Sequence, residues 1–390
     1  MISLVVPTYK ERENIGQVIE RSRAALASTG EGFEIIVVDD NSPDGTAEEG
    51  RRLAETRPWL RLVVRENERD LSTAVMAGWK VAKGDVLGCI DADLQHPPEV
   101  LADMVQRLRS ANADIVVASR RVAGATMKFS LSRRLASWVA TVLAAFVLPG
   151  TLRAVHDPMS GFFLVRRKVL ENATLSPIGY KILLEILANG DYQRVGEVPF
   201  TFEERAHGGS KAGLRIFGKY VAHLCRIALR TGEAKRMLKF GLVGLSGVPV
   251  NYFALRFFQN WLHWPTMIAA SAGVGLAIVS NFIWNDLFTF WETRKVDPGM
   301  KATFRRFVLF TLFSLGGAVI NIAALAFLLR IKMPLLPAVA IGIILAGAFN
   351  FVANANFSWR AFWSHKLLAH VDSEMNTVVQ KKAADVYARE

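Results

Sequence analysis

Two carboxylates separated by one residue, Asp91 and Asp93, follow an apolar segment of the chain. Both can approach one divalent cation, Mg²⁺ or Mn²⁺, and the carboxamide of Gln95 can add a neutral oxygen ligand. Such an ion would hold a nucleotide diphosphate that the carboxylates alone would repel, and it would stabilise the charge of the leaving group. An isolated Asp-x-Asp sequence is more often a solvated turn or a helix cap, so this interpretation depends on the surrounding elements.

Alternating segments in the first half of the chain predict the elements that must hold these residues. Short apolar runs, typical of buried parallel strands, lie at 2–7, 33–39, 60–66, 85–91 and 114–118. Helical patterns separate them at 11–28, 46–56, 72–82 and 98–110. This alternation predicts a doubly wound, Rossmann-like α/β sheet. Ligands of such sheets bind beyond the carboxyl ends of the strands, where Asp91, Asp93 and the polar runs 7–11 and 39–45 fall.

The second half of the chain contains long apolar segments. They lie near residues 240–262, 267–290, 307–329 and 335–357, and each can cross a hydrocarbon core of roughly 30 Å as a helix. Lys and Arg concentrate before the first segment, between the second and third, and after the fourth. The positive-inside rule therefore predicts an integral protein of the cell membrane, with the N-terminal domain and both termini in the cytoplasm.

The apolar segments form two related pairs, which predict an all-α domain of four transmembrane helices. Asn281 and Asn285, near the end of the second segment, recur as Asn350 and Asn354 near the end of the fourth. These asparagines are interpreted as structural groups that hydrogen-bond between helices, and the alternative is a lipid-phosphate or transport site. Small residues along the segments allow close helix contact, so an oligomer can form through these helices.

The composition of the chain indicates which class of partner it binds. The formal net charge of +12 and the isoelectric point near 9.8 indicate an anionic partner. Because the basic residues largely adjoin apolar segments, we expect anionic lipid headgroups and no nucleic acid. Cys89 and Cys225 lie far apart in unlike contexts, which argues against a disulfide or a zinc site. The N-terminus is typical of a first strand and not of a cleaved secretion signal.

Three stretches resemble one enzyme family. VVPTYKERENI, VVDDNSPDGT and DADLQHPPE are similar to the dolichyl-phosphate mannosyltransferases and their bacterial polyprenyl-phosphate relatives in glycosyltransferase family 2. The resemblance covers about residues 1–215 and implies the GT-A fold of nucleotide-diphospho-sugar transferases. The apolar segments resemble the GtrA-like family through the repeated Asn-Phe-x-x-Asn pattern. We expect a catalytic domain, an interfacial helix, a GtrA-like domain and a polar cytoplasmic tail at 1–212, 213–236, 237–364 and 365–390.

The resemblance implies a donor site at the edge of the sheet. Asp91, Asp93 and Gln95 would bind the metal ion and through it the donor diphosphate. Arg205 and Lys211 would clamp that diphosphate as their loop closes, although a plain basic surface loop is the simpler alternative. The residues implied to bind the donor are Pro7, Tyr9, Glu11, Val38, Asp40, Asp91, Ala92, Asp93, Arg205 and Lys211.

The resemblance also implies an acceptor site beside the membrane. Arg120, after the fifth strand, can contact a phosphate, and Arg133 lies near the start of an apolar stretch interpreted as an interfacial helix. A headgroup contact is nearly as well supported for Arg133. By the same resemblance, the stretch DPMSGFF would shape the sugar and acceptor region, with Ser160 toward the acceptor and Asp157 near a sugar hydroxyl or a cationic partner. The residues expected to act in catalysis are Asp91, Asp93, Arg120 and Arg133.

These inferences predict inverting transfer of a mannosyl residue from GDP-mannose to dolichyl or polyprenyl phosphate. Lys10 stands where the family has asparagine, and residues 69–74 lack the glycines of its Gly-Leu-Gly-Thr-Ala element, so the donor stays open. Transfer from UDP-glucose to undecaprenyl phosphate is the first alternative. The second is a lipid-linked sugar flippase with a nucleotide-binding domain.

Overall fold

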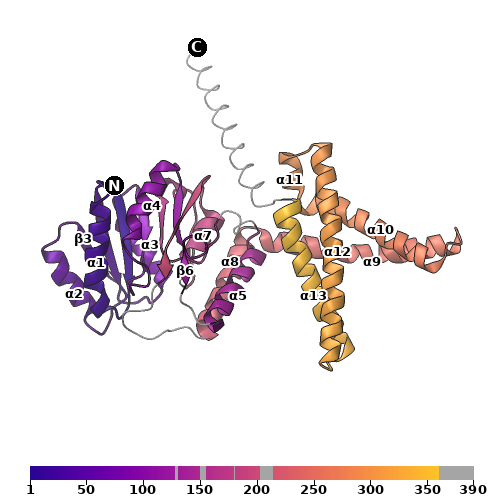
Figure 1. The fold of residues 1–390 in the computed structure, drawn as a ribbon, viewed down its shortest axis with the longest axis horizontal. Helices are drawn as coiled ribbons and strands as arrows, with labels where there is room; N and C mark the ends of the chain where they lie inside the picture. Colours follow the sequence, from indigo (N-terminus) through magenta and orange to yellow (C-terminus); the bar gives the residue numbers. More distant parts are fainter. Residues whose placement is uncertain (128–130, 150–154, 180, 203–213, 360–390) are drawn as a thin grey trace, which may run out of the picture. The chain divides into compact units, whose positions relative to one another are not determined.

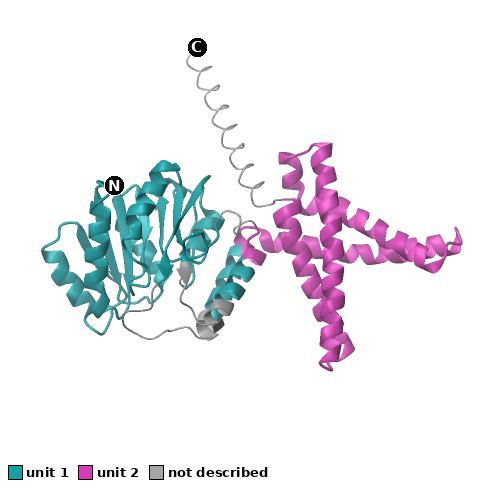
Figure 2. Cartoon of the chain, in the orientation of Figure 1, with its two compact units in different colours: residues 1–144, 151–227 teal, residues 145–150, 228–390 magenta. Residues whose placement is uncertain are grey.

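The computed structural model describes residues 1–127, 131–149, 155–179, 181–202 and 214–359, and their side chains apart from 126–127, 131–136 and 214–216. The chain forms two compact units (Figure 2). One unit consists of residues 1–144 and 151–227, and the other of residues 145–150 and 228–390.

Strands and helices alternate along the first unit (Figure 1). The strands are β1 (Ile2–Thr8), β2 (Phe33–Asp39), β3 (Leu60–Val64), β4 (Val86–Cys89), β5 (Ile115–Ser119), β6 (Thr126–Met127), β7 (Phe163–Arg166), β8 (Val195–Pro199) and β9 (Thr201–Phe202). The helices that lie in it or begin in it are α1 (Arg12–Ala27), α2 (Thr46–Glu55), α3 (Leu71–Val81), α4 (Val100–Ser110), α5 (Leu131–Val147), the 3₁₀ turn η1 (Arg167–Val169), α7 (Ile182–Asn189) and α8 (Leu214–Arg230). The predicted α/β fold is confirmed.

In the described part of the chain, seven strands form one sheet in the order β3-β2-β1-β4-β7-β5-β8. Strands β1 to β4 are parallel, as the sequence predicts. Strand β7 differs, because it lies antiparallel between β4 and β5. The sequence does not predict this strand, because its four residues, Phe163–Arg166, show no clear alternation. Since Phe163 pairs with Cys89, β7 brings residues 157–162 to the carboxyl end of β4.

Helices cover both faces of the sheet, which explains the continuous apolar runs of β1 and β2. Successive side chains of a strand point to opposite faces. Leu4 and Val37 belong to the hydrophobic cluster that includes side chains of α1 and α4. On the other face, a Cβ added to Gly78 of α3 would lie 2.7 Å from a methyl group of Val5. The absence of a side chain at Gly78 therefore sets how closely α3 packs on the sheet.

The second unit is helical. Its elements are α9 (Glu233–Asn260), α10 (Thr266–Trp284), the π-helical turn η2 (Asn285–Thr289), α11 (Trp291–Val296), α12 (Met300–Arg330), α13 (Leu335–Ala353) and the π-helical turn η3 (Asn354–Ser358). Among the described residues, four helices are long and apolar enough to cross a membrane. They are Glu233–Asn260, Thr266–Thr289, Met300–Arg330 and Leu335–Ser358, so the predicted number of membrane segments is confirmed.

The two helical hairpins, α9 with α10 and α12 with α13, repeat the same close contacts. A Cβ added to Gly247 would lie 2.6 Å from the side chain of Asn281, and one added to Gly317 would lie 2.5 Å from that of Asn350. The pairs Asn251 with Gly273 and Asn321 with Gly342 repeat a second such contact. Asparagine against glycine therefore sets the helix spacing in both hairpins, as expected for small residues at membrane helix contacts.

The repeated asparagines Asn285 and Asn354 make a different bond from the one expected. The Nδ2 of Asn285 donates to the backbone oxygen of Asn281 at 2.9 Å, and that of Asn354 donates to the oxygen of Asn350 at 2.8 Å. Both bonds run within one helix, at its π-helical turn, and not between helices. The backbone N–H groups of Asn285 and Asn354 also donate to these oxygens, so each oxygen accepts from both the backbone and the side chain of one asparagine.

A buried polar cluster, which the sequence analysis missed, joins parts of the second unit. Arg306 is fully buried, and its Nε donates to Asp286 Oδ1 at 2.9 Å. The indole Nε1 of Trp359 donates to the same oxygen at 2.9 Å. A buried charge must be paired, so this cluster fixes how α12 meets the ends of the other helices.

Candidate active site

The loops that follow β1, β2 and β4 meet at one edge of the sheet, because these strands are parallel neighbours. Each loop holds a non-glycine residue with left-handed backbone: Lys10 at φ 61°, Asn41 at φ 52° and Leu94 at φ 59°. Left-handed backbone is costly for a residue with a Cβ. Strained residues that share one edge of a sheet point to a functional site there.

Replacement of Lys10 by asparagine is expected to stabilise the protein, since asparagine adopts left-handed backbone more readily than lysine. The gain should be up to about 1 kcal/mol, which would raise the melting temperature of a domain of this size by roughly 2–4 °C. Thermal unfolding of the purified chain measures the change. Lys83→Asn is the control, because Lys83 is also exposed and has no positive φ. An unchanged melting temperature in Lys10→Asn would contradict the assigned strain.

The residues expected to bind the metal ion lie together on the turn after β4. Asp93 and Gln95 are buried, Asp91 is partly exposed, and the N–H of Gln95 donates to Asp93 Oδ1 at 3.2 Å. Gly161 lies behind Asp91, because an added Cβ would come within 2.8 Å of Asp91 Oδ2. Carboxylate and carboxamide oxygens within one turn form a donor set that Mg²⁺ and Mn²⁺ accept. The residues present therefore fit a divalent cation.

The fully buried Asp157 and the largely buried Arg120 form an ion pair beside this turn. Arg120 donates Nε–H and Nη2–H to the two oxygens of Asp157 at 2.7 and 2.8 Å, and its backbone N–H donates at 3.1 Å. Burial raises the pKa of Asp157, but the bonds from Arg120 outweigh that effect and hold the pKa below its usual value. Asp157 thus meets a cationic partner, and the fixed guanidinium plane can present its other N–H donors to an anion.

Lys181, which the sequence analysis did not single out, belongs to the same cluster. Its Nζ donates to the backbone oxygen of Met159 at 2.6 Å. Its pKa is lowered to about 8, chiefly by burial and also by the charge of Arg120, against the opposing effects of Asp91 and Asp157. These carboxylates and cations therefore act on one another within one site. A lone lysine ahead of an apolar helix carries no pattern that a sequence could reveal.

At the nucleotide end of the predicted site, Pro7 pairs with Val38 in the sheet register. The ring of Tyr9 lies 5.6 Å from Lys10 Nζ and 5.1 Å from Arg69 Cζ. Both cations stand where the sequence departs from the family pattern. The departures therefore gather at one aromatic ring, the ring implied to contact the nucleotide.

Asp40 is buried, and both of its oxygens hold the loop at 65–70. Arg65 Nε donates to Oδ1 at 2.7 Å, and the backbone N–H of Asp70 donates to Oδ2 at 3.1 Å. Burial raises the pKa of Asp40 despite the opposing effect of Arg65. Asp40 therefore anchors the loop at 65–70, and its direct contact with base or ribose stays a prediction.

The structure gives less information on the role of the other predicted site residues. Glu11 Oε2 accepts from Asn14 Nδ2 at 2.8 Å at the start of α1. Ser160 is buried, and its Oγ accepts from the backbone N–H of Phe162 at 3.2 Å. Ala92 is buried between the two acidic residues of the turn. Arg133 lies in α5 with its side chain outside the described set, and Arg205 and Lys211 lie outside the described residues.

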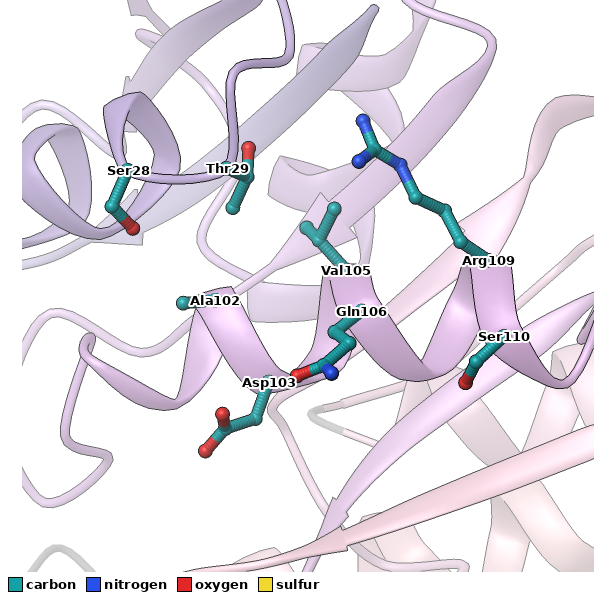
Figure 3. Close-up of a pocket in the computed structure, with 8 residues that line it drawn as sticks. All are labelled: Ser28, Thr29, Ala102, Asp103, Val105, Gln106, Arg109 and Ser110. Carbon is teal, nitrogen blue, oxygen red and sulfur yellow. The ribbon is translucent and has the colours of Figure 1, made fainter.

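The hollow in Figure 3 is a separate feature. It is lined by residues from the end of α1 and from α4, among them Ser28, Asp103 and Arg109. Helix α1 runs back along the sheet after β1, so its last turn lies at the edge opposite the carboxyl end of β1. This hollow is therefore not part of the candidate active site.

Comparison with known proteins defines the class. Residues 3–173 match the family model of glycosyl transferase family 2, and residues 239–359 match that of the GtrA/DPMS transmembrane domain. The protein is thus a glycosyltransferase that is integral to a membrane. Its fold is similar to that of glucosyl-3-phosphoglycerate synthase from Mycobacterium tuberculosis, with a TM-score of 0.43 at 20% identity over 59% of this chain and 79% of that one.

A relative that matches nearly the full length of this chain shows the family. The chain is 40% identical over 359 residues to the dolichol-phosphate mannosyltransferase of Pyrococcus furiosus. This alignment covers 92% of this chain and 99% of the relative. It is 36% identical to the dolichol-phosphate mannosyltransferase of Saccharomyces cerevisiae, over 61% of this chain and 91% of the relative. The chain belongs to the dolichol-phosphate mannosyltransferase family, as the sequence motifs imply.

Proposed function

We propose that the protein transfers a mannosyl residue from GDP-mannose to dolichyl or another polyprenyl phosphate, giving polyprenyl-phosphate mannose. Similarity over 92% of the chain to one relative named dolichol-phosphate mannosyltransferase supports the proposal. Within the structure, the observation that carries it is the gathering of Asp91, Arg120 and Lys181 around residues 157–161. Arg120 bonds to Asp157, Lys181 Nζ donates to the backbone oxygen of Met159, and Gly161 lies against Asp91. A site that gathers carboxylates and cations suits a reaction between two phosphate-bearing substrates.

On the donor side, Asp91, Asp93 and Gln95 would hold a divalent cation, Mg²⁺ or Mn²⁺. When bound, the cation would act as a Lewis acid that stabilises the negative charge on the departing nucleotide diphosphate. The chain's own contribution is the fixed turn, in which the N–H of Gln95 holds Asp93 and the backbone of Gly161 lies against Asp91. The ring of Tyr9 and the loop held by Asp40 would receive the nucleotide.

On the acceptor side, no strong protein base is required. The second pKa of a phosphate monoester is about 6, so the acceptor is already mostly an anionic nucleophile near neutral pH. The difficulty is that the two anionic substrates repel each other. Arg120 and Lys181 would offset this repulsion from fixed positions. Further proposed cations are Arg133, Arg205 and Lys211. Asp157 keeps the guanidinium of Arg120 in place.

Direct attack of the acceptor phosphate at the anomeric carbon inverts that carbon in a single displacement. We therefore expect a β-linked mannosyl phosphate from the α-linked donor, without a glycosyl-enzyme intermediate. The anomeric configuration of the product, measured by NMR, tests this step. Retention of the α configuration would contradict it.

The interfacial helices suit a lipid acceptor. Trp138 of α5 and Phe217 and Leu229 of α8 are exposed apolar side chains on helices that also carry charged residues. We propose that these helices lie at the cytoplasmic face of the cell membrane, with both termini in the cytoplasm. An oligomer through the transmembrane helices and the domain boundaries at 212, 236 and 364 are part of the same proposal.

Radiolabel transfer tests the proposed function. Membranes or detergent-purified protein should move labelled mannose from GDP-mannose to polyprenyl phosphate in the presence of Mg²⁺ or Mn²⁺. A chelator should abolish the transfer and added cation should restore it. Faster transfer from UDP-glucose than from GDP-mannose would contradict the proposed donor and favour UDP-glucose. Donor binding without any turnover would support the flippase alternative and contradict an enzyme.

A further inference from the structure

His96 is a buried histidine next to the metal-binding turn. It is 4% exposed and lies among the rings of Phe162, Phe200 and Phe202, with centroid distances of 5.7, 5.3 and 5.5 Å. Within the described residues, neither Nδ1 nor Nε2 has a hydrogen-bond partner. A buried polar atom without a partner is destabilising, and native structures hold few of them, so this ring requires an explanation.

The ring is aimed at a residue of the candidate metal site. Its Nδ1 lies 3.5 Å from Asp91 Oδ2. In either protonation state the ring can present an N–H donor to a carboxylate oxygen. A neutral imidazole carries one N–H donor and one acceptor nitrogen. The gap exceeds a good N–H···O distance by roughly 0.5 Å, which a small shift of Asp91 would close.

Packing alone does not explain a histidine at this position. Phenylalanine would fill a pocket lined by aromatic rings without burying two unsatisfied nitrogens. What histidine adds is a donor directed at Asp91. Carboxylates that bind metal ions are commonly oriented by a hydrogen bond from outside the ligand set, and loss of that bond weakens metal binding.

We propose that His96 is a positioning residue for the metal site: its Nδ1–H orients the Asp91 carboxylate for a divalent cation without binding the cation itself. The inference rests on the proposed function in one respect, that Asp91 is a metal ligand. It adds a residue outside the set of Asp91, Asp93 and Gln95. It also accounts for an unsatisfied ring that would otherwise only destabilise the domain.

Three substitutions separate the positioning role from packing. His96→Phe removes the donor and keeps the aromatic volume. His96→Asn keeps an N–H near the place of Nδ1, whereas His96→Gln moves its N–H toward the place of Nε2. Mn²⁺ affinity of the full chain in detergent is measured by the EPR signal of free Mn²⁺, with Mn²⁺ alone and with GDP added. His263→Phe is the control, because His263 is exposed between α9 and α10.

His96→Phe and His96→Gln should weaken Mn²⁺ binding about 10- to 100-fold, while His96→Asn stays within about threefold of the unmodified chain. The melting temperature of His96→Phe should be equal or higher, since it loses unsatisfied buried nitrogens. Unchanged Mn²⁺ affinity in both His96→Phe and His96→Gln would overturn the inference. If Mn²⁺ binding follows this pattern but the unmodified chain does not transfer mannose, the proposed function is contradicted and the positioning role of His96 is supported.

Discussion

Replacement of Asp93 by asparagine is expected to lower the turnover number for mannosyl transfer by about 10³-fold. Loss of one carboxylate from the ion's ligands forfeits several kcal/mol of charge stabilisation, and each 1.36 kcal/mol is worth a factor of ten. The turn itself should survive, because the side-chain oxygen of asparagine can still accept the N–H of Gln95. The measurement is initial rate at saturating donor and acceptor with a fixed concentration of Mn²⁺.

Asp103→Asn is the matched control for this substitution. Asp103 is an exposed carboxylate on α4, away from the carboxyl ends of the strands, so its loss should leave turnover unchanged. The melting temperature of Asp93→Asn shows whether the domain is intact. Turnover of an intact Asp93→Asn protein within about threefold of the unmodified chain would contradict the assignment of Asp93 to the metal site.

Replacement of Asp157 by alanine is expected to have the largest effect on stability. It would leave the guanidinium of Arg120 without its buried partner, at a cost of about 3–5 kcal/mol. For a domain of this size the melting temperature should fall by roughly 6–20 °C. The double variant Asp157→Leu with Arg120→Met should recover much of the loss, since it leaves no unpaired buried charge. An Asp157→Ala variant as stable as the unmodified chain would contradict the prediction that Arg120 is destabilising without its partner.

The same pair predicts a pH dependence of stability. The pKa of Asp157 in the folded protein lies below its unfolded value of about 3.9, because Arg120 bonds to the charged form. Its contribution is therefore fully present above pH 3.9 and is lost as the pH falls through the lower folded pKa. Melting temperatures between pH 5 and pH 3 should fall less steeply in Asp157→Ala than in the unmodified chain. Equal slopes would contradict this linkage.

The features that the sequence predicted are those encoded in local patterns. Buried parallel strands read as apolar runs, so the succession from β1 to β5 could be found without a structure. The turn with Asp91 and Asp93 was found because polar residues at the ends of such strands share one edge. The transmembrane helices follow from the length of their apolar segments.

The features that the sequence does not predict depend on contacts between residues far apart in the chain. Strand β7 is short and antiparallel, and only its pairing with β4 and β5 shows that it brings residues 157–162 to the active site. Lys181 lies in none of the family-like stretches, and His96 lies in DADLQHPPE without a role that the pattern assigns. Their roles emerge from the contacts with Met159 and Asp91. The contact of Asp40 with the nucleotide stays a prediction, and the hold of its oxygens on the 65–70 loop is a link that spacing cannot reveal.

The most direct test of the account locates the cation. Crystals or cryo-EM samples of the full chain with Mn²⁺ and GDP should place the ion on the turn after β4, with oxygens of Asp91 and Asp93 about 2.0–2.3 Å away. Anomalous scattering at the manganese edge identifies the ion in the crystals. A manganese ion bound elsewhere in the first unit, with neither carboxylate in contact, would contradict the account.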